Sequence, residues 1–425
     1  MPKLLIRNGR VIDPANGIDR VADVLLANGI IRGVGGNLPS RGAEDFDATG
    51  LIVAPGFIDM HVHLREPGFE SSETIESGSR CAAAGGFTSI CCMPNTNPVN
   101  DTPHLTRYII ERALSVAKVN VFPIGAITKG SAGEELASIG AMQAAGTVAI
   151  SDDGRPVMNS RVMRRAMEIA ASFDILVIDH CEDLNLSAGG EMHEGKASLR
   201  YGLRGIPACS EDVMVARDLL LAELTGARYH VAHISTKNAI AMVAEAKRRG
   251  LRVSCEVTPH HFAIHDLEII PYDSNYKMKP PIRCSHDVEA MIEGIKAGVI
   301  DAIATDHAPH SVTDKMQEFE RCPFGILGLE TAIGITFERL VHPGHISIQR
   351  MIELFTTGPA SILKLNRGSL SPGLPADVTI LDPQSKWTYD VNKSPSKSRN
   401  SPFDATAFTG RAVATIVSGE LVWQA

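Results

Sequence analysis

Long apolar runs are missing from this sequence. No stretch approaches the ~20 consecutive apolar residues that a membrane-spanning helix needs, and the opening Met-Pro-Lys-Leu-Leu-Ile-Arg lacks the apolar core of a signal peptide. An excess of positive charge is missing too, because the formal net charge is −8. These absences favour a cytoplasmic protein whose partners are neither membranes nor nucleic acids.

Cysteines at the C-x-x-C spacing are also missing, although Cys91 and Cys92 are adjacent. The eight cysteines are scattered along the chain and none of them forms a C-x-x-C pattern. We interpret them as reduced thiols, most of them buried, and as weaker metal-ligand candidates than the histidines and aspartates. The chain contains no internal repeat, so its 425 residues fit one large α/β domain and a smaller one.

From Pro55 onward, strand-like segments alternate with helical stretches. Eight strands are predicted over residues 57–63, 87–93, 120–127, 147–151, 175–180, 229–233, 252–257 and 300–305. Helical periodicity is found over residues 102–116, 160–171, 211–224, 238–248 and 288–297. Eight β-then-α units predict a (β/α)₈ barrel of the TIM type.

The two ends of the chain have a different pattern, with short strands and turns. Residues 4–12 are typical of a strand, an Asn-Gly turn and a second strand, and Asn28-Gly29 predicts another hairpin. A last hairpin is predicted through Ser418-Gly419, and residues 391–402 are expected to form a polar loop or linker.

The predicted architecture is therefore an α/β fold with two parts. Residues 54–365 are expected to form the barrel. Residues 1–53 and 366–425 are expected to pair into one small β-sandwich domain beside it.

Six of the eight predicted strands end in a polar or metal-ligating residue. In a (β/α)₈ barrel all strands open onto the same catalytic face, so residues far apart in sequence converge there. The strand ends concerned carry His61 and His63, Asn95, Asp152 and Asp153, His180, His233, and Asp306.

Strand alternation selects candidate ligands among the histidines. Residues two apart on a strand point the same way, so His61 and His63 project from one face and form half of a metal site. By the same alternation His233 is a candidate ligand, whereas His230 is expected to pack toward the helices. His180 is either a ligand or a hydrogen-bonded core histidine.

The carboxylates complete the candidate site. Asp152 or Asp153 can bridge two metal ions, and the residues alone do not choose between them. Asp306 can take a proton from a metal-bound water and return it to a leaving nitrogen. The whole set favours metal-assisted hydrolysis over a structural role. Weaker candidates, expected to support the ligands or the fold, are Glu256, Thr258, His260 and His261.

These residues lie in motifs that resemble the amidohydrolase superfamily, and within it the dihydroorotase family, over nearly the whole chain. The motifs are Asp59–Gly68, Met93–Thr96, Ser151–Gly154, Asp179–Glu182 and Ala304–His310, together with Gly325–Glu330 and Ser396–Asp404. The resemblance implies a cyclic amide hydrolase that uses one or two Zn²⁺ per subunit. Its reaction would interconvert N-carbamoyl-L-aspartate and L-dihydroorotate in the de novo pyrimidine pathway to UMP.

The resemblance also implies a role for each metal ligand. His61 and His63 would hold one zinc ion, and His180 and His233 the other. Asp153 would bridge them, and Asp306 would be both a ligand and the general acid/base, with metal-bound hydroxide as the nucleophile.

Substrate binding is implied for a further set of residues, namely Arg65, Asn95, His310 and the backbone of Phe324 and Gly325. The first three would hold carboxylates, a task for which the arginine fork is well suited. A homo-oligomer is expected, and an aspartate transcarbamoylase is a candidate partner.

The sequence departs from its relatives at two points. Residues 145–155 lack the lysine that many amidohydrolases carboxylate to bridge their metals, so an aspartate must serve, as in one dihydroorotase branch. Lys279 stands where that branch has a substrate-contacting asparagine, and we carry no role over to it.

Two other functions compete with this hypothesis. One is a different cyclic amidohydrolase, such as a hydantoinase or an allantoinase, which Arg65, Asn95 and the missing lysine disfavour. The other is a non-catalytic relative that acts as a scaffold, which the complete ligand set disfavours.

Overall fold

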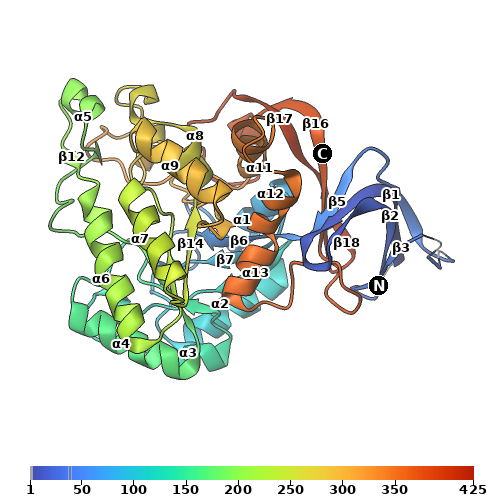
Figure 1. Cartoon of the computed structure of the whole chain (residues 1–425), viewed down its shortest axis with the longest axis horizontal. Helices are drawn as coiled ribbons and strands as arrows, with labels where there is room; N and C mark the ends of the chain where they lie inside the picture. Colours follow the sequence, from blue (N-terminus) through green and yellow to red (C-terminus); the bar gives the residue numbers. More distant parts are fainter. Residues whose placement is uncertain (1–2, 37, 40) are drawn as a thin grey trace.

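Eight parallel strands close into the predicted barrel in the computed structural model, which describes residues 3–36, 38–39 and 41–425 (Figure 1). The barrel strands are β6 (Phe57–Val62), β7 (Phe87–Cys92), β8 (Asn120–Pro123), β9 (Ala149–Ile150), β10 (Leu176–Asp179), β13 (Tyr229–Val231), β14 (Val253–Val257) and β15 (Ala302–Ile303). They form one ladder from β6 to β8 and another from β9 to β15. All eight predicted strands are confirmed, each shorter than predicted, and β8, β9 and β15 cover half or less of their predicted ranges.

Two parallel bridges close the ring between these ladders. Gly125 pairs with Ile150, and Val62 at the end of β6 pairs with His307 just beyond β15. The buried carboxylate of Asp59 reinforces the second seam, because it accepts hydrogen bonds from the Thr305 backbone N–H at 3.2 Å and from the Thr305 hydroxyl at 2.6 Å. The first and last strands of the barrel are thereby held together at the catalytic face.

Helices surround the barrel, as predicted. They are α1 (Ile75–Ala84), α2 (Pro103–Val116), α3 (Ile139–Ala145), α4 (Ser160–Phe173), α6 (Cys209–Thr225), α7 (Lys237–Arg248), α9 (Ser285–Lys296), α11 (Ala332–Thr336), α12 (Ile348–Phe355) and α13 (Thr357–Leu363). Shorter elements lie in the loops: α5 (Lys196–Tyr201), α8 (Pro259–Ala263), α10 (Val312–Lys315), β11 (Met192–His193) and β12 (Gly205–Ile206). The five predicted helical stretches are confirmed, with small shifts of their ends.

Local sequence signals explain where several helices begin. The side chains of Thr102 and Thr236 accept hydrogen bonds from the backbone at the first turns of α2 and α7, and Asn159 does the same for α4. Such caps satisfy backbone N–H groups that have no partner inside the helix.

Both ends of the chain contribute to a separate sheet, which Figure 1 shows beside the barrel with both termini. Its strands are β1 (Lys3–Asp13), β2 (Ile18–Ala27), β3 (Ile30–Gly35), β4 (Glu44–Asp47), β5 (Ile52–Pro55), β16 (Val378–Thr388), β17 (Ala407–Val417) and β18 (Glu420–Gln424). The order is β18-β17-β16-β5-β1-β2-β3, with β4 on β1. Antiparallel pairing of β5 with β16 joins the two ends, which confirms the predicted β domain of the fold. We call it the β module.

The domain boundaries at 53/54 and 365/366 stay a prediction. In the structure β5 runs over residues 52–55 and belongs to the sheet of the β module.

One turn prediction is wrong and two are confirmed. Residues 4–12 form no hairpin, because β1 runs continuously through them and Asn8, at φ 61°, takes part in a bulge between Ile6 and Gly9. The Asn28-Gly29 and Ser418-Gly419 turns join β2 to β3 and β17 to β18, with positive φ at all four residues.

The predicted polar loop 391–402 is a loop, but it is not an exposed linker. Ser396, Ser398 and Asn400 are buried. The Ser398 hydroxyl donates to Ser72 O at 2.7 Å, so the segment packs on the barrel.

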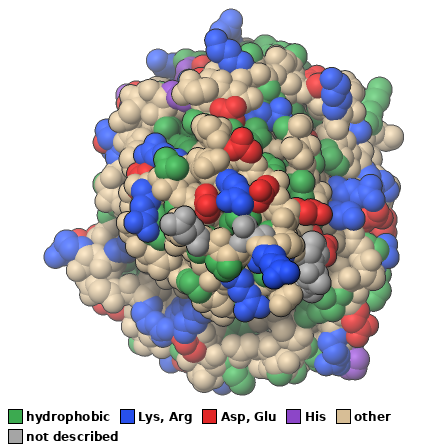
Figure 2. All heavy atoms as spheres, turned by 90° about the vertical axis from the view of Figure 1, so that its right-hand side faces the viewer, with side chains coloured by type: hydrophobic (Ala, Val, Ile, Leu, Met, Phe, Trp, Pro, Cys, Tyr) green, Lys and Arg blue, Asp and Glu red, His purple; other side chains and the backbone are tan. Residues whose placement is uncertain are grey.

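Charged side chains of both signs are mixed on one face of the molecule. Figure 2 shows basic and acidic side chains interspersed on the face that carries β1–β3. Among the described residues, no helix combines the length and the apolar composition that crossing a membrane requires.

An aromatic cluster anchors the start of the barrel against α12. The rings of Phe57 and Phe355 stack at 5.1 Å between centroids, and Phe87 meets Phe355 edge-on at 5.8 Å. All three side chains are fully buried. The cluster therefore ties β6 and β7, which lead to the candidate site, to a helix near the C-terminal end of the barrel.

Phe355→Ala should destabilise the protein by ~3–5 kcal/mol, because it opens a cavity between two other rings. Urea unfolding of the variant measures the loss. Leu114→Ala is the matched control, since Leu114 is 83% exposed and its removal should cost little. Equal midpoints for the two variants would contradict the packing role of Phe355.

Candidate metal centre

Four histidines surround Asp153 at the carboxyl ends of the barrel strands. Asp153 Oδ1 lies 3.4 Å from His61 Nε2, and Asp153 Oδ2 lies 3.5 Å from His63 Nε2. The same Oδ1 atom is 3.5 Å from His180 Nδ1 and 3.6 Å from His233 Nε2. All five side chains are buried. One carboxylate therefore faces all four predicted histidines.

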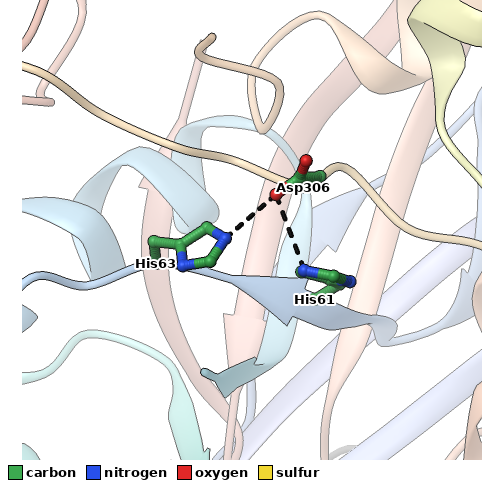
Figure 3. Close-up of side chains that lie close together, drawn as sticks. All are labelled: His61, His63 and Asp306. Atoms are coloured by element: carbon green, nitrogen blue, oxygen red, sulfur yellow. Dashed lines mark hydrogen bonds and ion pairs between the residues drawn. The ribbon is translucent and has the colours of Figure 1, made fainter. Parts of the chain in front are cut away.

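Asp306 closes the cluster from the end of β15. Its Oδ1 atom lies 3.0 Å from His63 Nε2 and 3.5 Å from His61 Nε2, as Figure 3 shows. Two overlapping groups, His61–His63–Asp306 and His61–Asp153–His233, each bring three ligand atoms within 4.8 Å of one another. The geometry thus brings all six predicted ligands together.

The donor set fits a metal ion. His61 Nε2 and Asp153 Oδ1 are buried and have no hydrogen-bond partner among the described residues, although they face each other. Leaving buried polar atoms unpartnered is costly. A divalent cation between them would satisfy both, and imidazole nitrogen with carboxylate oxygen is a usual first-row metal set.

The outward nitrogens of the first two histidines are held by other side chains. His61 Nδ1 lies 2.8 Å from Glu256 Oε1, and His63 Nδ1 lies 2.9 Å from Asn95 Oδ1. Such contacts fix the ring orientation and leave the Nε2 atoms directed at the centre. Glu256, predicted only as a weaker candidate, therefore contacts and orients the candidate ligand His61 directly.

His180 has a comparable support that the sequence did not reveal. Its Nε2 atom lies 3.0 Å from Glu182 Oε2, and Lys279 Nζ donates to Glu182 Oε1 at 2.7 Å. Burial would raise the pKa of Glu182, but His180 and Lys279 hold it well below its ordinary value. Lys279 therefore acts on the candidate metal centre indirectly, because it pairs with the Glu182 carboxylate that holds His180.

The buried charges compensate one another. Burial would lower the pKa of His61, but the charges and hydrogen bonds of Asp153 and the other carboxylates raise it well above its ordinary value. Burial is likewise outweighed at His180, whose pKa Asp153 and Glu182 raise to about 10. Burial would raise the pKa of Asp153, but the histidines hold it well below its usual range. The positive charges of protonated imidazole rings therefore balance the negative charges of the carboxylates when no metal cation is bound.

The structure distinguishes the two neighbouring aspartates. Asp152 Oδ1 accepts hydrogen bonds from the backbone N–H groups of Ile127 at 2.8 Å and Thr128 at 3.1 Å. Asp152 therefore fixes the loop after β8, whereas Asp153 faces the histidines.

The predicted position of His230 is wrong. Its Nδ1 atom lies 2.8 Å from Ser254 Oγ and its Nε2 atom lies 3.3 Å from Glu256 Oε2. Glu256 also contacts His61, so the His230 ring lies on the side of the candidate metal site and not toward the helices. Tyr229 points the other way, with its hydroxyl 3.2 Å from Cys181 Sγ. Alternation fails because β13 ends at Val231 and His233 reaches the centre from a turned backbone with φ 32°.

The other weaker candidates form hydrogen bonds with one another, with Thr258 Oγ1 2.9 Å from His260 Nε2 and 2.6 Å from His261 Nδ1.

A cavity of about 230 Å³ lies next to Asp153 and is lined in part by Arg65 and Asn95. Arg65 Nε donates to Pro309 O at 3.0 Å, and its Nη2 atom is 3.3 Å from His310 Nε2. Burial lowers the pKa of Arg65 to about 10, so the guanidinium stays charged at neutral pH. A cation thus stands at the cavity beside the candidate metal centre. Arg155, which the sequence analysis did not select, also lines this cavity.

The remaining predicted substrate residues are His310, Phe324 and Gly325, and His310 contacts Arg65. His310 Nε2 lies 2.8 Å from Phe324 O, and burial together with Arg65 lowers the pKa of His310 to about 3. The backbone N–H of Gly325 donates to Lys277 O at 2.9 Å. The polar backbone groups of this loop are therefore engaged within the protein.

Asn400 is a residue that the sequence analysis missed. Its Nδ2 atom donates to Ala308 O and to Gly325 O, both at 3.0 Å, and its Oδ1 atom accepts from the His310 backbone N–H at 3.2 Å. The side chain therefore joins both arms of the loop 307–326. The only sequence signal was its place within the motif Ser396–Asp404.

Comparison with known proteins places the chain in a class. The family model for dihydro-orotase-like proteins matches residues 50–239, and the model for the amidohydrolase family matches residues 222–423. A solved L-hydantoinase (dihydropyrimidinase) from Arthrobacter aurescens superposes with a TM-score of 0.88 at 26% identity, covering 100% of this chain and 96% of that one. With the barrel and the strand-end ligand set, these matches define an amidohydrolase, an enzyme that acts on cyclic amide bonds.

Curated relatives narrow the class to one family. A protein named dihydroorotase from Solibacter usitatus is 70% identical over 420 residues, which is 99% of this chain and 98% of that protein. Another, from Geobacter metallireducens, is 50% identical over 99% of both chains. The chain belongs to the dihydroorotase family.

Metal binding should release protons. The raised pKa of His61 and the pKa of about 10 for His180 leave both rings protonated at pH 7 in metal-free protein, whereas a metal ion binds neutral imidazole. Affinity should therefore rise with pH up to these pKa values, with on the order of two protons released per binding event near pH 7. Calorimetric titration of metal-free protein in buffers of different ionisation enthalpy measures this release. A pH-independent affinity would contradict the charge balance.

Proposed function

We propose that this enzyme interconverts N-carbamoyl-L-aspartate and L-dihydroorotate in de novo pyrimidine synthesis, with one or two Zn²⁺ ions per subunit. The observation that carries the proposal is the charged guanidinium of Arg65 at the cavity beside Asp153. Dihydroorotate has a ring carboxylate that Arg65 can bind, and simple hydantoins do not. The names of the 70% and 50% identical relatives support the same substrate.

The metal assignment follows the pairs of histidines. We assign His61 and His63 to one ion, His180 and His233 to the other, and Asp153 to a position between them, in agreement with its distances. Nitrogen and oxygen ligands without thiolate are compatible with Zn²⁺. When bound, zinc lowers the pKa of a water molecule to about 7, so hydroxide becomes available at neutral pH.

Asp306 is the proposed proton carrier. Burial would raise its pKa, but the charges of His61, His63 and His233 hold it well below its ordinary value. The carboxylate is therefore ionised at neutral pH, the form that can accept a proton from the attacking water. It can then return that proton to the ring nitrogen that leaves as the amide bond breaks.

Three side chains are proposed to hold the substrate carboxylates. Arg65 offers a bidentate fork, and Asn95 presents its amide nitrogen while its oxygen holds His63. His310 lies against Arg65. We expect hydrolysis to be favoured at mildly alkaline pH and cyclisation at lower pH, since protonation of the carbamoyl aspartate carboxyl favours ring closure.

The backbone of Phe324 and Gly325 is proposed to border the ring, although its polar groups contact His310, Lys277 and Asn400. A homo-oligomer, an aspartate transcarbamoylase partner and a cytoplasmic location stay predictions.

Metal analysis followed by rate measurements on dihydroorotate, hydantoin and dihydrouracil tests the proposed function. Zinc-loaded protein should turn over dihydroorotate best. Faster turnover of hydantoin or dihydrouracil would replace the proposal with a hydantoinase function, and no turnover of any ring would favour a scaffold.

Asp306→Asn should lower kcat for dihydroorotate by ~10² or more, the usual scale for losing a general acid/base. The amide keeps the size of the side chain, so bound metal should be largely retained. Stopped-flow or steady-state rates and metal analysis are measured on the same preparation. Wild-type kcat with full metal content would place the proton carrier elsewhere.

Arg65→Met should weaken transition-state binding of dihydroorotate by about 2–5 kcal/mol, the range for breaking a buried charged pair. Residual turnover of uncharged dihydrouracil should change much less. Arg161→Met, on the exposed first turn of α4, is the matched control. An equal loss for both substrates would show that Arg65 does not recognise the carboxylate.

Asn400→Ala should raise KM for dihydroorotate by about tenfold while kcat changes little, because the loop that carries His310 loses hydrogen bonds worth ~1–3 kcal/mol. Asn392→Ala, an exposed position on the same segment, serves as control. A fall in kcat with unchanged KM would argue against a positioning role for Asn400.

A further inference from the structure

A second cavity lies between the barrel and the β module, away from the metal centre. Its volume is about 300 Å³, within the range of small-molecule sites. The ends of α1 and α11 form one wall and strands β16–β18 the other, a region that Figure 1 shows at the junction of the two parts. Both tryptophans of the chain, Trp387 and Trp423, line it.

Arg411 lies between these two rings. Its Cζ atom is 4.9 Å from the centroid of Trp387 and 5.6 Å from that of Trp423. The guanidinium has one hydrogen bond, from Nε to Ala412 O at 3.2 Å, and no further hydrogen bond or ion pair within residues 3–36, 38–39 and 41–425. The terminal N–H groups of a half-buried cation are thus left for another partner.

The rest of the lining supplies acceptors and a second cation. Glu330 accepts hydrogen bonds from the Ser394 hydroxyl and, at 3.5 Å, from Cys81 Sγ. Burial raises the pKa of Glu330, and its charge counteracts the lowering that burial causes in the pKa of Arg411. Lys393 stands exposed at the rim, 3.7 Å from Asp390. The cavity therefore combines flat aromatic rings, a free guanidinium fork and a hydrogen-bond acceptor.

We propose that this cavity binds a small flat ring that carries one carboxylate or phosphate group. The anion would meet the Arg411 fork, which binds either group in a bidentate manner. The ring would stack on a tryptophan, and its N–H groups would face Glu330. A cation–π pair accounts for Arg411 lying over Trp387, but not for the concave space next to its free donors. The site goes beyond the proposed function and uses none of the metal-centre residues.

Intrinsic fluorescence reports this site directly, because the only two tryptophans of the sequence line it. Metal-loaded full-length protein is titrated with UMP, AMP, benzoate and inorganic phosphate, and calorimetry measures the same affinities. At least one ring-bearing anion should change the fluorescence saturably, and inorganic phosphate should bind more weakly. The nucleotide and benzoate arms separate a phosphate ligand from a carboxylate ligand. The absence of saturable binding for all ring-bearing probes overturns the proposal.

Variants of Arg411 test whether the ligand binds in this cavity. Arg411→Met should weaken binding at least about tenfold, the scale for losing hydrogen bonds to a charged group, and Arg411→Lys should weaken it less. Arg10→Met is the matched control, because Arg10 lies on the same sheet but pairs with Asp19. Circular dichroism confirms folding, and dihydroorotate turnover should stay unchanged in all three variants. Equal affinity in Arg411→Met and wild type overturns the proposal, whatever the outcome for the dihydroorotate reaction.

Discussion

The compensation of buried charge around Asp153 is the constraint on which the catalytic face depends. Four imidazoles converge on this carboxylate, and Asp306 adds a second negative charge. Burying any one of these groups alone would be costly, because an unpaired charge in a protein interior loses its hydration. The groups are tolerable only together, either with protons on the histidines or with a cation among them. A bound metal should therefore stabilise the fold as well as supply chemistry.

Side chains that contact the candidate ligands extend this constraint through the barrel. Glu256 holds His61 from the seventh strand, and Glu182, itself paired with Lys279, holds His180. Asp59 locks the first strand to the last through Thr305. Buried polar contacts thus set both the site geometry and the barrel closure, which helps to hold candidate ligands from five strand ends within a few ångströms of one another.

The β module contributes to the site although its sheet lies beside the barrel. The loop after β16 returns to the catalytic face, where Asn400 ties together the two arms of the loop that carries His310. The same segment contributes Lys393 and Pro395 to the lining of the second cavity, and Ser394 between them donates to Glu330. The loop between β16 and β17 therefore links the β module to the loop that carries His310.

Local patterns predicted most of this arrangement. The eight strands follow from apolar segments separated by helical periodicity, and barrel topology alone brings the polar strand ends, such as His61 and Asp306, together. Predictions failed where the backbone leaves its regular geometry. His233 has a positive φ, so strand alternation counted back from it misplaced His230, and the Asn8-Gly9 pair forms a bulge where a turn was expected. Tertiary partners such as Asn400 and Lys279 follow from no local pattern.

Anomalous X-ray diffraction at the zinc absorption edge, on crystals grown with zinc and without substrate, would locate the metal relative to Asp153. We expect anomalous density in contact with Asp153, flanked by His61 and His63 on one side and by His180 and His233 on the other, with Asp306 at the first pair. Density for zinc elsewhere in the molecule, with the side chains around Asp153 bonded only to one another or to water, would contradict this expectation.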